Sequence, residues 1–308
     1  AAAKPFLLYI PFNHVHSPNF ASEDFCNTST HGPVGDATQE MDHAIGVIVD
    51  GVDALGLDEN TVWFFTSDNG APLANDKQGN GPLRDGKMTT WEGGIREPAF
   101  IRWKGEHGFR GGRITDAVVA TYDIFATVIA LAKAPAPKGV VLDGVDLTAT
   151  LRDPNAAAPH TCLFHYWSPQ LVNDAQFGNT SGVAAVRCGK YKVHYYIRIT
   201  GPGQHAPTKL KAGPQNPPAL FDLDVDISES NPLDLSTPAA QTAMSQINAA
   251  LAEHLAGVVM VPNQMINNKS CAASLAVSCV GGNDINLAVC KDPSSKSKYP
   301  QFPNCTSN

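Results

Sequence analysis

The stretch GDATQEMDHAIGVIVDGVDALGLDENTVWFFTSDNG, residues 35–70, decides the fold of this 308-residue chain. Its first part predicts an amphipathic helix that closes at Gly56, because apolar residues recur every three or four positions; these are Met41, Ile45, Ile48, Val52 and Leu55. TVWFFTS, residues 61–67, follows as a short apolar run typical of a buried strand. The chain therefore leads from a helix into a strand, and polar residues stand directly after that strand.

A second apolar run, KPFLLYIPF (Lys4–Phe12), precedes the helix and has the composition of another covered strand. Strand, helix and strand in this order form a βαβ unit, so we expect a parallel sheet and an α/β fold. Ligands gather at the carboxyl ends of strands in such sheets. His14 and His16 follow the first strand, and Asp68 and Asn69 follow the second. We therefore expect both pairs at the same edge of the sheet.

Two more elements are predicted before the composition changes. EPAFIRW, residues 97–103, has the pattern of a strand, and residues 116–132 have that of a helix, which APAPKG at 134–139 ends. The stretch Asn155–Pro159 is loop-like. We therefore expect the α/β domain to occupy residues 1–155.

Beyond that boundary the sequence predicts a smaller antiparallel subdomain over residues 156–265. Short apolar runs within 161–199 have the pattern of strands joined by turns, and ALFDLDVD at 219–226 forms one more strand after a Pro/Gly-rich loop at 201–218. A helix is expected at 240–258, with one apolar face formed by Met244, Ile247, Leu251, Leu255 and Val258.

Composition and charge exclude several classes of protein. A formal charge of −7 argues against nucleic-acid binding, which needs a basic surface. There is no run of about 18 apolar residues, so no membrane span is expected. The start AAAKPFLLYI lacks the layout of a signal peptide. We therefore expect the chain to begin after processing or inside a larger gene product.

The cysteines and glycosylation sequons favour the secretory pathway. Four of the seven cysteines lie in residues 266–308, which predicts a disulfide-stapled tail, and the odd cysteine is free or pairs outside the chain. Four N-x-[ST] sequons begin at Asn27, Asn179, Asn268 and Asn304. We expect a glycosylated protein that is secreted or lysosomal.

Asp68 and Asn69 are candidate metal ligands, because a carboxylate beside an amide oxygen supplies two hard donors suited to Ca²⁺ or Mg²⁺. Two oxygens do not fill a calcium shell of about six to eight ligands, so further carboxylates must come from elsewhere. A plain turn at Asn69-Gly70 is the alternative interpretation.

Two further side chains are candidates for contact with an anionic substrate. His16 could donate to an anionic oxygen or protonate a leaving group, whereas His14 is either a second contact or an ordinary loop residue. Lys87 could neutralise a sulfate or phosphate oxygen, since Trp91 and Ile95 suggest that its loop is held against the core. Local ion pairs are expected to shape this loop through Arg84, Glu92 and Arg96.

The sequence resembles the type I sulfatases, especially the arylsulfatase and N-acetylgalactosamine-6-sulfatase branch. The similar pieces in family order are KPFLLYIPFNHVHSP, GPVGDATQEMDHAIG, LGLDENTVWFFTSDNG and GPLRDGKMTTWEGGIREP, with AAVRCGKYKVHYY and ALFDLDVDISESNPL later. The resemblance implies an alkaline-phosphatase-like α/β fold, a partial mixed or parallel sheet flanked by helices. A smaller C-terminal subdomain of antiparallel sheet and helix would follow, and residues 1–155 would be the C-terminal part of the catalytic domain.

The resemblance also implies roles for single residues. Asp68 and Asn69 would be two of four protein ligands of a Ca²⁺ ion, and His16 and Lys87 would contact the sulfate of the substrate. His205, in the GPGQHAP loop, would match a histidine of the substrate pocket. The implied substrate is an aryl or carbohydrate sulfate ester.

Other family features are missing from the chain. Sulfatases attack with a formylglycine made from the cysteine of a C-x-P-S-R-like motif, and no cysteine here has that context. The Asp-Asp pair and the Lys-x-His of the family are absent too, and Met88 stands where a glycine is usual. We therefore expect an N-terminal sulfatase chain or segment as partner, and an isolated chain that is inactive and unstable.

Two other functions stay open from the sequence. One is a catalytically inactive sulfatase-like protein that binds sulfated glycans, and the other is a related phosphatase or phosphotransferase. The segment TTWEGGIREP, residues 89–98, favours the sulfatases over the latter. Self-association into a homo-oligomer also stays open.

Overall fold

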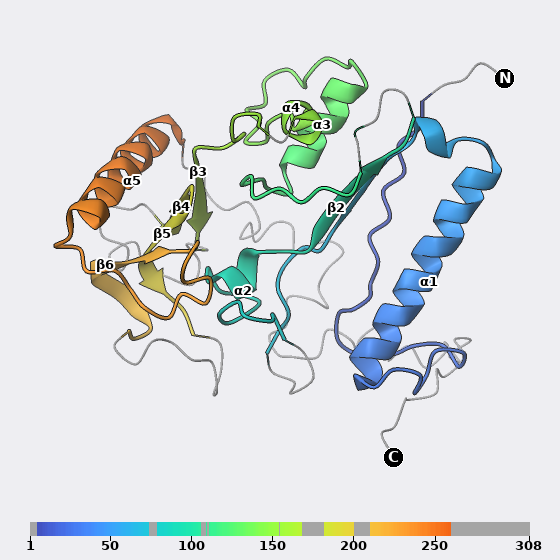
Figure 1. The fold of residues 1–308 in the computed structure, drawn as a ribbon, viewed down its shortest axis with the longest axis horizontal. Helices are drawn as coiled ribbons and strands as arrows, with labels where there is room; N and C mark the ends of the chain where they lie inside the picture. The colour runs from blue at the N-terminus through green and yellow to red at the C-terminus, as the bar shows by residue number, and fades with distance from the viewer. Residues whose placement is uncertain are drawn as a thin grey trace, which may run out of the picture.

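The computed structural model describes residues 5–73, 79–105, 109, 111–153, 155–167, 182–199 and 210–259. No helix in these segments is long and apolar enough to cross a membrane. The elements (Figure 1) follow one another as α1 (Gly32–Ala54), η1 (Asp58–Asn60), β1 (Val62–Thr66), α2 (Glu92–Ile95), β2 (Ala99–Trp103), α3 (Asp123–Leu131), α4 (Thr148–Arg152), β3 (Cys162–Tyr166), β4 (Val183–Cys188), β5 (Tyr191–Ile197), β6 (Gly213–Asp222) and α5 (Pro238–Gly257).

Helix α1 and strand β1 form where the sequence predicts them. Pro33 stands in the first turn of the helix, where a missing N–H costs nothing. Gly56 ends the helix in a left-handed conformation with φ of 68°, and its N–H donates to the carbonyl of Asp53 at 2.8 Å. The chain then turns through η1 into β1, so the helix–strand unit is confirmed.

The prediction of a parallel sheet is wrong for the described residues. Strand β1 pairs with β2 in an antiparallel ladder that runs from Val62 opposite Trp103 to Thr66 opposite Ala99. Residues 5–12 form no strand. A strand exists only through ladder bonds to a neighbour, and no described segment pairs with residues 5–12.

Residues 5–12 nevertheless run in the general direction of β1. In Figure 1 this dark-blue segment descends from the N-terminus to the loop before α1, and β1 descends from the far end of the same helix. The loops that follow the two segments therefore emerge toward the same side of the molecule. The path of the chain agrees with a βαβ unit although the ladder is missing.

Helix α3 begins at Asp123, seven residues after the start predicted for the 116–132 helix. The Asp123 carboxylate accepts hydrogen bonds from the N–H groups of Ala120, at 2.7 Å, and Val145, at 2.9 Å. It also pairs with His160 at 2.8 Å. These bonds hold residues before the helix in an irregular conformation, a tertiary effect that apolar periodicity does not report.

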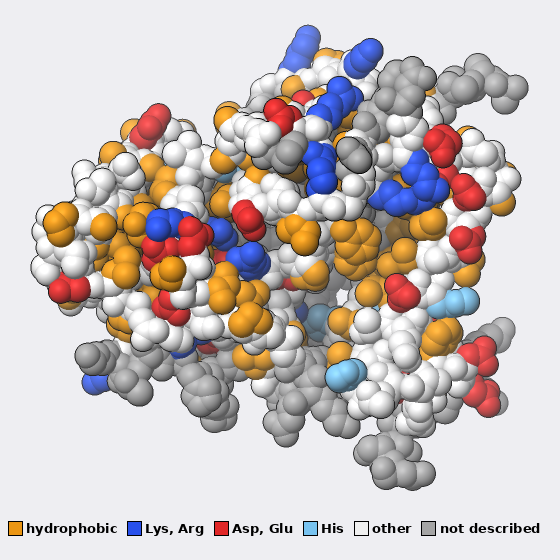
Figure 2. Space-filling view, viewed as in Figure 1, with side chains coloured by type: hydrophobic (Ala, Val, Ile, Leu, Met, Phe, Trp, Pro, Cys, Tyr) orange, Lys and Arg blue, Asp and Glu red, His pale blue; other side chains and the backbone are white. Residues whose placement is uncertain are grey.

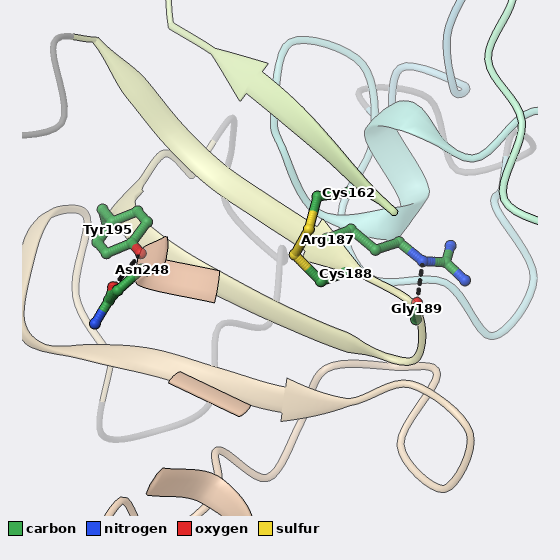
Figure 3. Close-up of a disulfide and its surroundings, with 6 residues drawn as sticks. All are labelled: Cys162, Arg187, Cys188, Gly189, Tyr195 and Asn248. Atoms are coloured by element: carbon green, nitrogen blue, oxygen red, sulfur yellow. Dashed lines mark hydrogen bonds between the residues drawn. A yellow bond between two sulfur atoms is a disulfide. The ribbon is translucent and has the colours of Figure 1, made fainter. Parts of the chain in front are cut away.

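The C-terminal part forms the predicted antiparallel sheet, with strand order β3-β4-β5-β6. Cys162 and Cys188 stand opposite each other in the β3–β4 ladder and form a disulfide (Figure 3). Strand β6 begins at Gly213, earlier than predicted, so the end of the expected 201–218 loop belongs to the sheet. The cysteine-rich tail at 266–308 lies outside the described residues.

Helix α5 packs on this sheet and closes the main core. The Thr237 side chain caps its first turn by accepting from the Ala240 N–H. Tyr195 of β5 donates from its hydroxyl to Asn248 Oδ1 at 3.1 Å, which ties sheet to helix (Figure 3). The shared core comprises Val183, Val186, Val193, Leu220, Ala240, Ala243, Ile247 and Leu251. The domain boundary near residue 155 stays a prediction.

Candidate active site

The loop after β1 is held by a second loop that lies more than twenty residues further along the chain. The Gly70 N–H donates to the carbonyl of Gly94 at 3.2 Å. A Cβ on Gly70 would lie 1.7 Å from the carbonyl oxygen of Gly93, so only glycine allows this approach. Asp68 and Asn69 are thereby fixed beside the segment that carries Lys87.

Asn80 completes the junction between the two loops. Its Oδ1 accepts from the Ala71 N–H at 2.9 Å, and its Nδ2 donates to the carbonyl of Asp85 at 2.7 Å. The Lys87 N–H donates to the carbonyl of Ala71 at 3.1 Å. Asn80 was not among the residues predicted from the sequence, where its one signal is the turn-forming Asn-Gly-Pro that it begins.

The carboxylate of Glu97 lies close enough to Asp68 for the two charges to interact. Its Oε1 is buried and has no hydrogen-bond partner in the described part of the chain. Burial raises the pKa of Glu97 to about 7, a hydrogen bond from Ser67 opposes this, and the charge of Asp68 adds to it. A cation at this place would relieve the repulsion between the two carboxylates.

The donor atoms of these residues are of the type that binds a hard divalent cation, but the residues are too few to complete its coordination shell. The amide nitrogen of Asn69 donates to the carbonyl of Gly70 at 3.2 Å, which leaves the amide oxygen as its donor atom for a ligand. Oxygen donors of this kind suit Ca²⁺. Within the described residues no group of three or more His, Cys, Asp or Glu is arranged to hold a metal, so the set needs further ligands.

Lys87 sits in a tightly folded loop, as predicted. Trp91 is only 1% exposed, and Thr89 donates from its hydroxyl to the carbonyl of Gly86 at 2.8 Å. Met88 has φ of 73°, the left-handed region that favours glycine. The loop therefore keeps the backbone that a glycine would adopt, although a methionine occupies the position.

The described contacts of His16 remain within its own loop. Its Nδ1 lies 2.7 Å from the carbonyl of Ser17, and its N–H donates to the carbonyl of Asn13 at 3.0 Å. His14 pairs loosely with Glu40 at 3.7 Å. In the segments that the structure describes, no hydrogen bond or ion pair links this loop to Asp68, Asn69 or Lys87. The predicted His205 lies outside the described residues.

The predicted ion pairs of the Lys87 loop are partly local. Glu92 and Arg96 do approach each other, at 3.6 Å. Arg84 instead donates from Nε to the carbonyl of Ser228 at 2.8 Å and from Nη2 to Ser230 Oγ at 2.9 Å. The expected local ion pair is therefore not found for Arg84 in the described residues, because its hydrogen-bond partners come from the C-terminal part of the chain.

Backbone hydrogen bonds hold the strand-end residues Asp68 and Asn69 beside the loop that carries Lys87, and these three side chains are candidates for binding an anion beside a divalent cation. Comparison with known families assigns the chain. The "Sulfatase" family matches residues 1–134, and "C-terminal region of aryl-sulfatase" matches residues 158–290. The chain belongs to the sulfatase family.

Curated relatives support this assignment over most of the chain. Arylsulfatase A of Bos taurus is 36% identical over 304 residues, which cover 94% of this chain and 54% of the relative. Steryl-sulfatase of Mus musculus is 35% identical over 281 residues, covering 85% of this chain and 43% of the relative. The chain spans about half the length of the curated relatives it matches.

A solved structure agrees at the level of the fold. The PsFucS1 sulfatase from Pseudoalteromonas sp. superposes with a TM-score of 0.67 at 27% sequence identity, covering 79% of this chain and 46% of that chain. The α/β sulfatase fold with a C-terminal antiparallel subdomain is thus confirmed. The fold class was predicted correctly although the parallel pairing of residues 5–12 was not.

Proposed function

We propose that this chain is part of a sulfuric ester hydrolase that acts on aryl or carbohydrate sulfate esters. The observation that carries the proposal is the junction of two loops, in which Gly70 bonds to Gly94 and Lys87 bonds to Ala71. This junction sets candidate cation ligands and a candidate sulfate-binding lysine side by side. Family membership supports the reaction class.

The cation in this proposal is Ca²⁺, with Asp68 and Asn69 as two of its ligands. Their oxygens are of the right kind, and the nearby Glu97 Oε1 has no hydrogen-bond partner among the described residues. In this proposal the remaining ligands come from outside this chain. When bound, the ion supplies fixed positive charge for the oxygens of the sulfate.

This chain's own side chains bind and orient the sulfate ester. Lys87 neutralises one sulfate oxygen as a point charge, and the folded loop around it limits the reorganisation that binding requires. His16 donates a hydrogen bond to a second oxygen or to the leaving group. The role of His205 as a substrate-pocket residue is part of the same proposal. The nucleophile, a formylglycine, belongs to a segment that this chain does not contain.

An exposed apolar surface supports the proposal of an N-terminal sulfatase segment as partner. Leu7 is 76% and Tyr9 82% exposed, and Phe100 of β2 is exposed as well. Figure 2 displays apolar side chains together in this region, beside α1. Such a surface is unusual on a soluble domain, and the match covers only 54% of bovine arylsulfatase A, so that relative has additional chain beyond the matched part.

We also propose that the protein matures in the secretory pathway as a glycoprotein. The disulfide between Cys162 and Cys188 is typical of an oxidising compartment. Asn27 is exposed and begins an N-x-[ST] sequon, so a glycan could be attached there. Release of N-glycans from native protein by a glycosidase should lower its mass, and an unchanged mass would contradict this proposal.

The first experiment is intact-mass and peptide mapping of native material, searching for a second segment with a formylglycine peptide. The complete protein should hydrolyse a small chromogenic aryl sulfate and lose activity when a chelator removes Ca²⁺. Lys87→Ala should lower kcat/KM by about 10²–10³-fold, the loss typical of one group that stabilises transition-state charge. The matched control is Lys190→Ala, which removes an exposed lysine that pairs with Asp222 on the sheet.

Two outcomes would overturn the proposal. Near-normal turnover of Lys87→Ala would remove this lysine from the site. Material that consists only of the 308 residues would lack the nucleophile and exclude hydrolysis by this molecule. Binding of sulfated glycans would then be the function to test.

A further inference from the structure

A cluster of buried charged side chains joins the Lys87 loop to the C-terminal sheet. Glu92 and Glu229 are 1% and 0% exposed, and Lys192 is 0% exposed. Lys192 Nζ lies 2.9 Å from Glu92 Oε1 and 3.1 Å from Glu229 Oε1. Arg187 adds a second positive charge, at 3.2 Å from Glu92 Oε2. The two carboxylates thus face three cations, Lys192, Arg187 and the partly exposed Arg96, which lies 3.6 Å from Glu92 Oε2.

Glu229 is the hub of this cluster. Its Oε2 accepts from the Glu92 N–H at 2.6 Å, and its Oε1 accepts from His194 Nε2 at 2.7 Å. Burial lowers the pKa of His194, although the Glu229 carboxylate opposes this shift. The Nδ1 atom of His194 lies 3.4 Å from the Thr90 hydroxyl. Glu229 thus bonds directly to the backbone of Glu92, and through His194 of β5 it is linked to the side chain of Thr90.

Close backbone packing in the loop between Lys87 and Glu92 couples the position of Lys87 to that of Glu92. Gly93 donates to the carbonyl of Arg84 at 2.8 Å, and a Cβ at Gly93 would lie 2.2 Å from the carbonyl oxygen of Asp85. Such close backbone packing leaves little room for Lys87 to move relative to Glu92. Gly94 in turn accepts from Gly70, beside Asp68 and Asn69.

The turn that carries Glu229 also forms hydrogen bonds with the beginning of the Lys87 loop. Arg84 bonds to the carbonyl of Ser228 and to Ser230 Oγ, as described above, and Ser228 donates from its hydroxyl to the carbonyl of Pro82 at 2.7 Å. Asp226 fixes the turn by accepting from the N–H groups of Ser230 and Asn231, the latter at 2.7 Å. The loop is therefore held at both ends from one turn.

We propose that Glu229, a residue of the C-terminal subdomain, is a positioning residue for sulfate binding. It holds the Lys87 loop in a fixed position relative to Asp68 and Asn69. Buried ion clusters contribute little net stability compared with apolar packing of the same volume, and their best-attested use is to specify one arrangement. This cluster lies beside the Lys87 loop, which must adopt a single conformation relative to Asp68 and Asn69 to bind sulfate. This inference rests on the proposed function.

The test is Glu229→Gln in the complete protein, which keeps the side-chain shape and removes the charge. We expect amide hydrogen exchange of residues 84–94 to be at least about tenfold faster. The inhibition constant of inorganic sulfate should rise by about tenfold or more. The control is Asp222→Asn, which makes the same chemical change in an exposed ion pair of the same sheet.

Arg84→Gln is the second variant, in case Glu229→Gln fails to fold. It removes the hydrogen bonds of Arg84 to Ser228 and Ser230 and leaves the buried cluster intact. Amide hydrogen exchange of the loop should therefore accelerate while the protein stays folded. Unchanged exchange and unchanged sulfate inhibition in a folded variant would overturn the proposal, whatever its thermal midpoint. If wild-type protein hydrolyses no sulfate ester, the proposed function fails, and exchange of residues 84–94 still tests the positioning role.

Discussion

The C-terminal sheet and the N-terminal strand pair bury their apolar residues to very different extents. Leu220 of β6 is fully buried and Ile247 of α5 is 1% exposed, both inside one core. Leu8, in the apolar run before α1, is 61% exposed, and no residue of β1 is fully buried. The two regions have similarly apolar sequences, so composition does not explain the difference.

The contrast lies in whether each apolar surface has a neighbour. The C-terminal sheet is covered by α5 and closed by a disulfide, whereas the described residues around β1 provide only β2 as a ladder partner. Burial of an apolar side chain stabilises a fold by about 1.5–3 kcal/mol, a gain that an uncovered segment forgoes. The first region has a covered apolar core, and the second leaves large apolar side chains exposed.

The largest expected effect comes from comparing one side-chain truncation to alanine in each region. Ile247→Ala should lower the free energy of unfolding of the C-terminal unit by about 3 kcal/mol, because it leaves a cavity in the core. Leu7→Ala should change the stability of the isolated chain by less than about 0.5 kcal/mol, since this side chain is 76% exposed. Urea unfolding of both variants measures the difference. Equal losses would mean that residues 5–12 are already covered in the isolated chain.

The disulfide offers the next test of the C-terminal unit. Its two cysteines are 26 residues apart in sequence, so the bond restricts the unfolded chain. Replacing both Cys162 and Cys188 by alanine should lower the free energy of unfolding by roughly 3 kcal/mol. Thermal unfolding, followed with and without reductant, measures this loss. A double variant as stable as the wild type would show that the sheet and α5 suffice.

A pH-dependent test concerns His165 of β3, whose Nε2 is enclosed without a partner in the described residues. Burial lowers the pKa of His165 to about 3 from the ordinary 6.5. The unfolded chain therefore binds the extra proton between these values, and stability falls as the pH drops from about 6.5 toward 3. This one group contributes a slope of at most about 1.4 kcal/mol per pH unit.

His165→Phe should make the loss of stability between pH 6 and pH 4 shallower, as measured by urea unfolding over that range. His31→Gln, at an exposed histidine before α1, is the matched control and should keep the wild-type slope. A His165→Phe slope identical to that of the wild type would show that this histidine is protonated in the folded protein.

The smallest expected effect concerns the loop between the two regions. Met88→Gly should raise the free energy of unfolding by about 0.5–1 kcal/mol, because the left-handed backbone at this position strains every residue with a Cβ. Gly86→Ala is the opposite test in the same loop, since its Cβ would lie 2.2 Å from the carbonyl oxygen of Ala71. A destabilised Met88→Gly would show that the half-exposed methionine side chain packs usefully.

Local features were readable from the sequence because neighbouring residues determine them. The period of α1, its end at Gly56 and the strand that stops before Asp68 follow from spacing and backbone preference. The metal-ligand and sulfate-contact roles of Asp68, Asn69, Lys87 and His16 stay predictions. The start of α3 was missed, since the bonds of the Asp123 carboxylate set it.

Only the tertiary structure decided which distant residues meet. The Glu92 N–H and the Glu229 carboxylate are 137 residues apart in sequence, and Lys192 lies 100 residues from Glu92. Glu92 was expected only in a local ion pair, and Lys192 and Glu229 were not selected from the sequence, because charged side chains are rarely buried. The sequence by itself determined the existence of helices α1, α3 and α5, most strands and the family pattern of the loops. The ion cluster and the uncovered surface depend on contacts that no local pattern encodes, because burial is a property of the assembled chain.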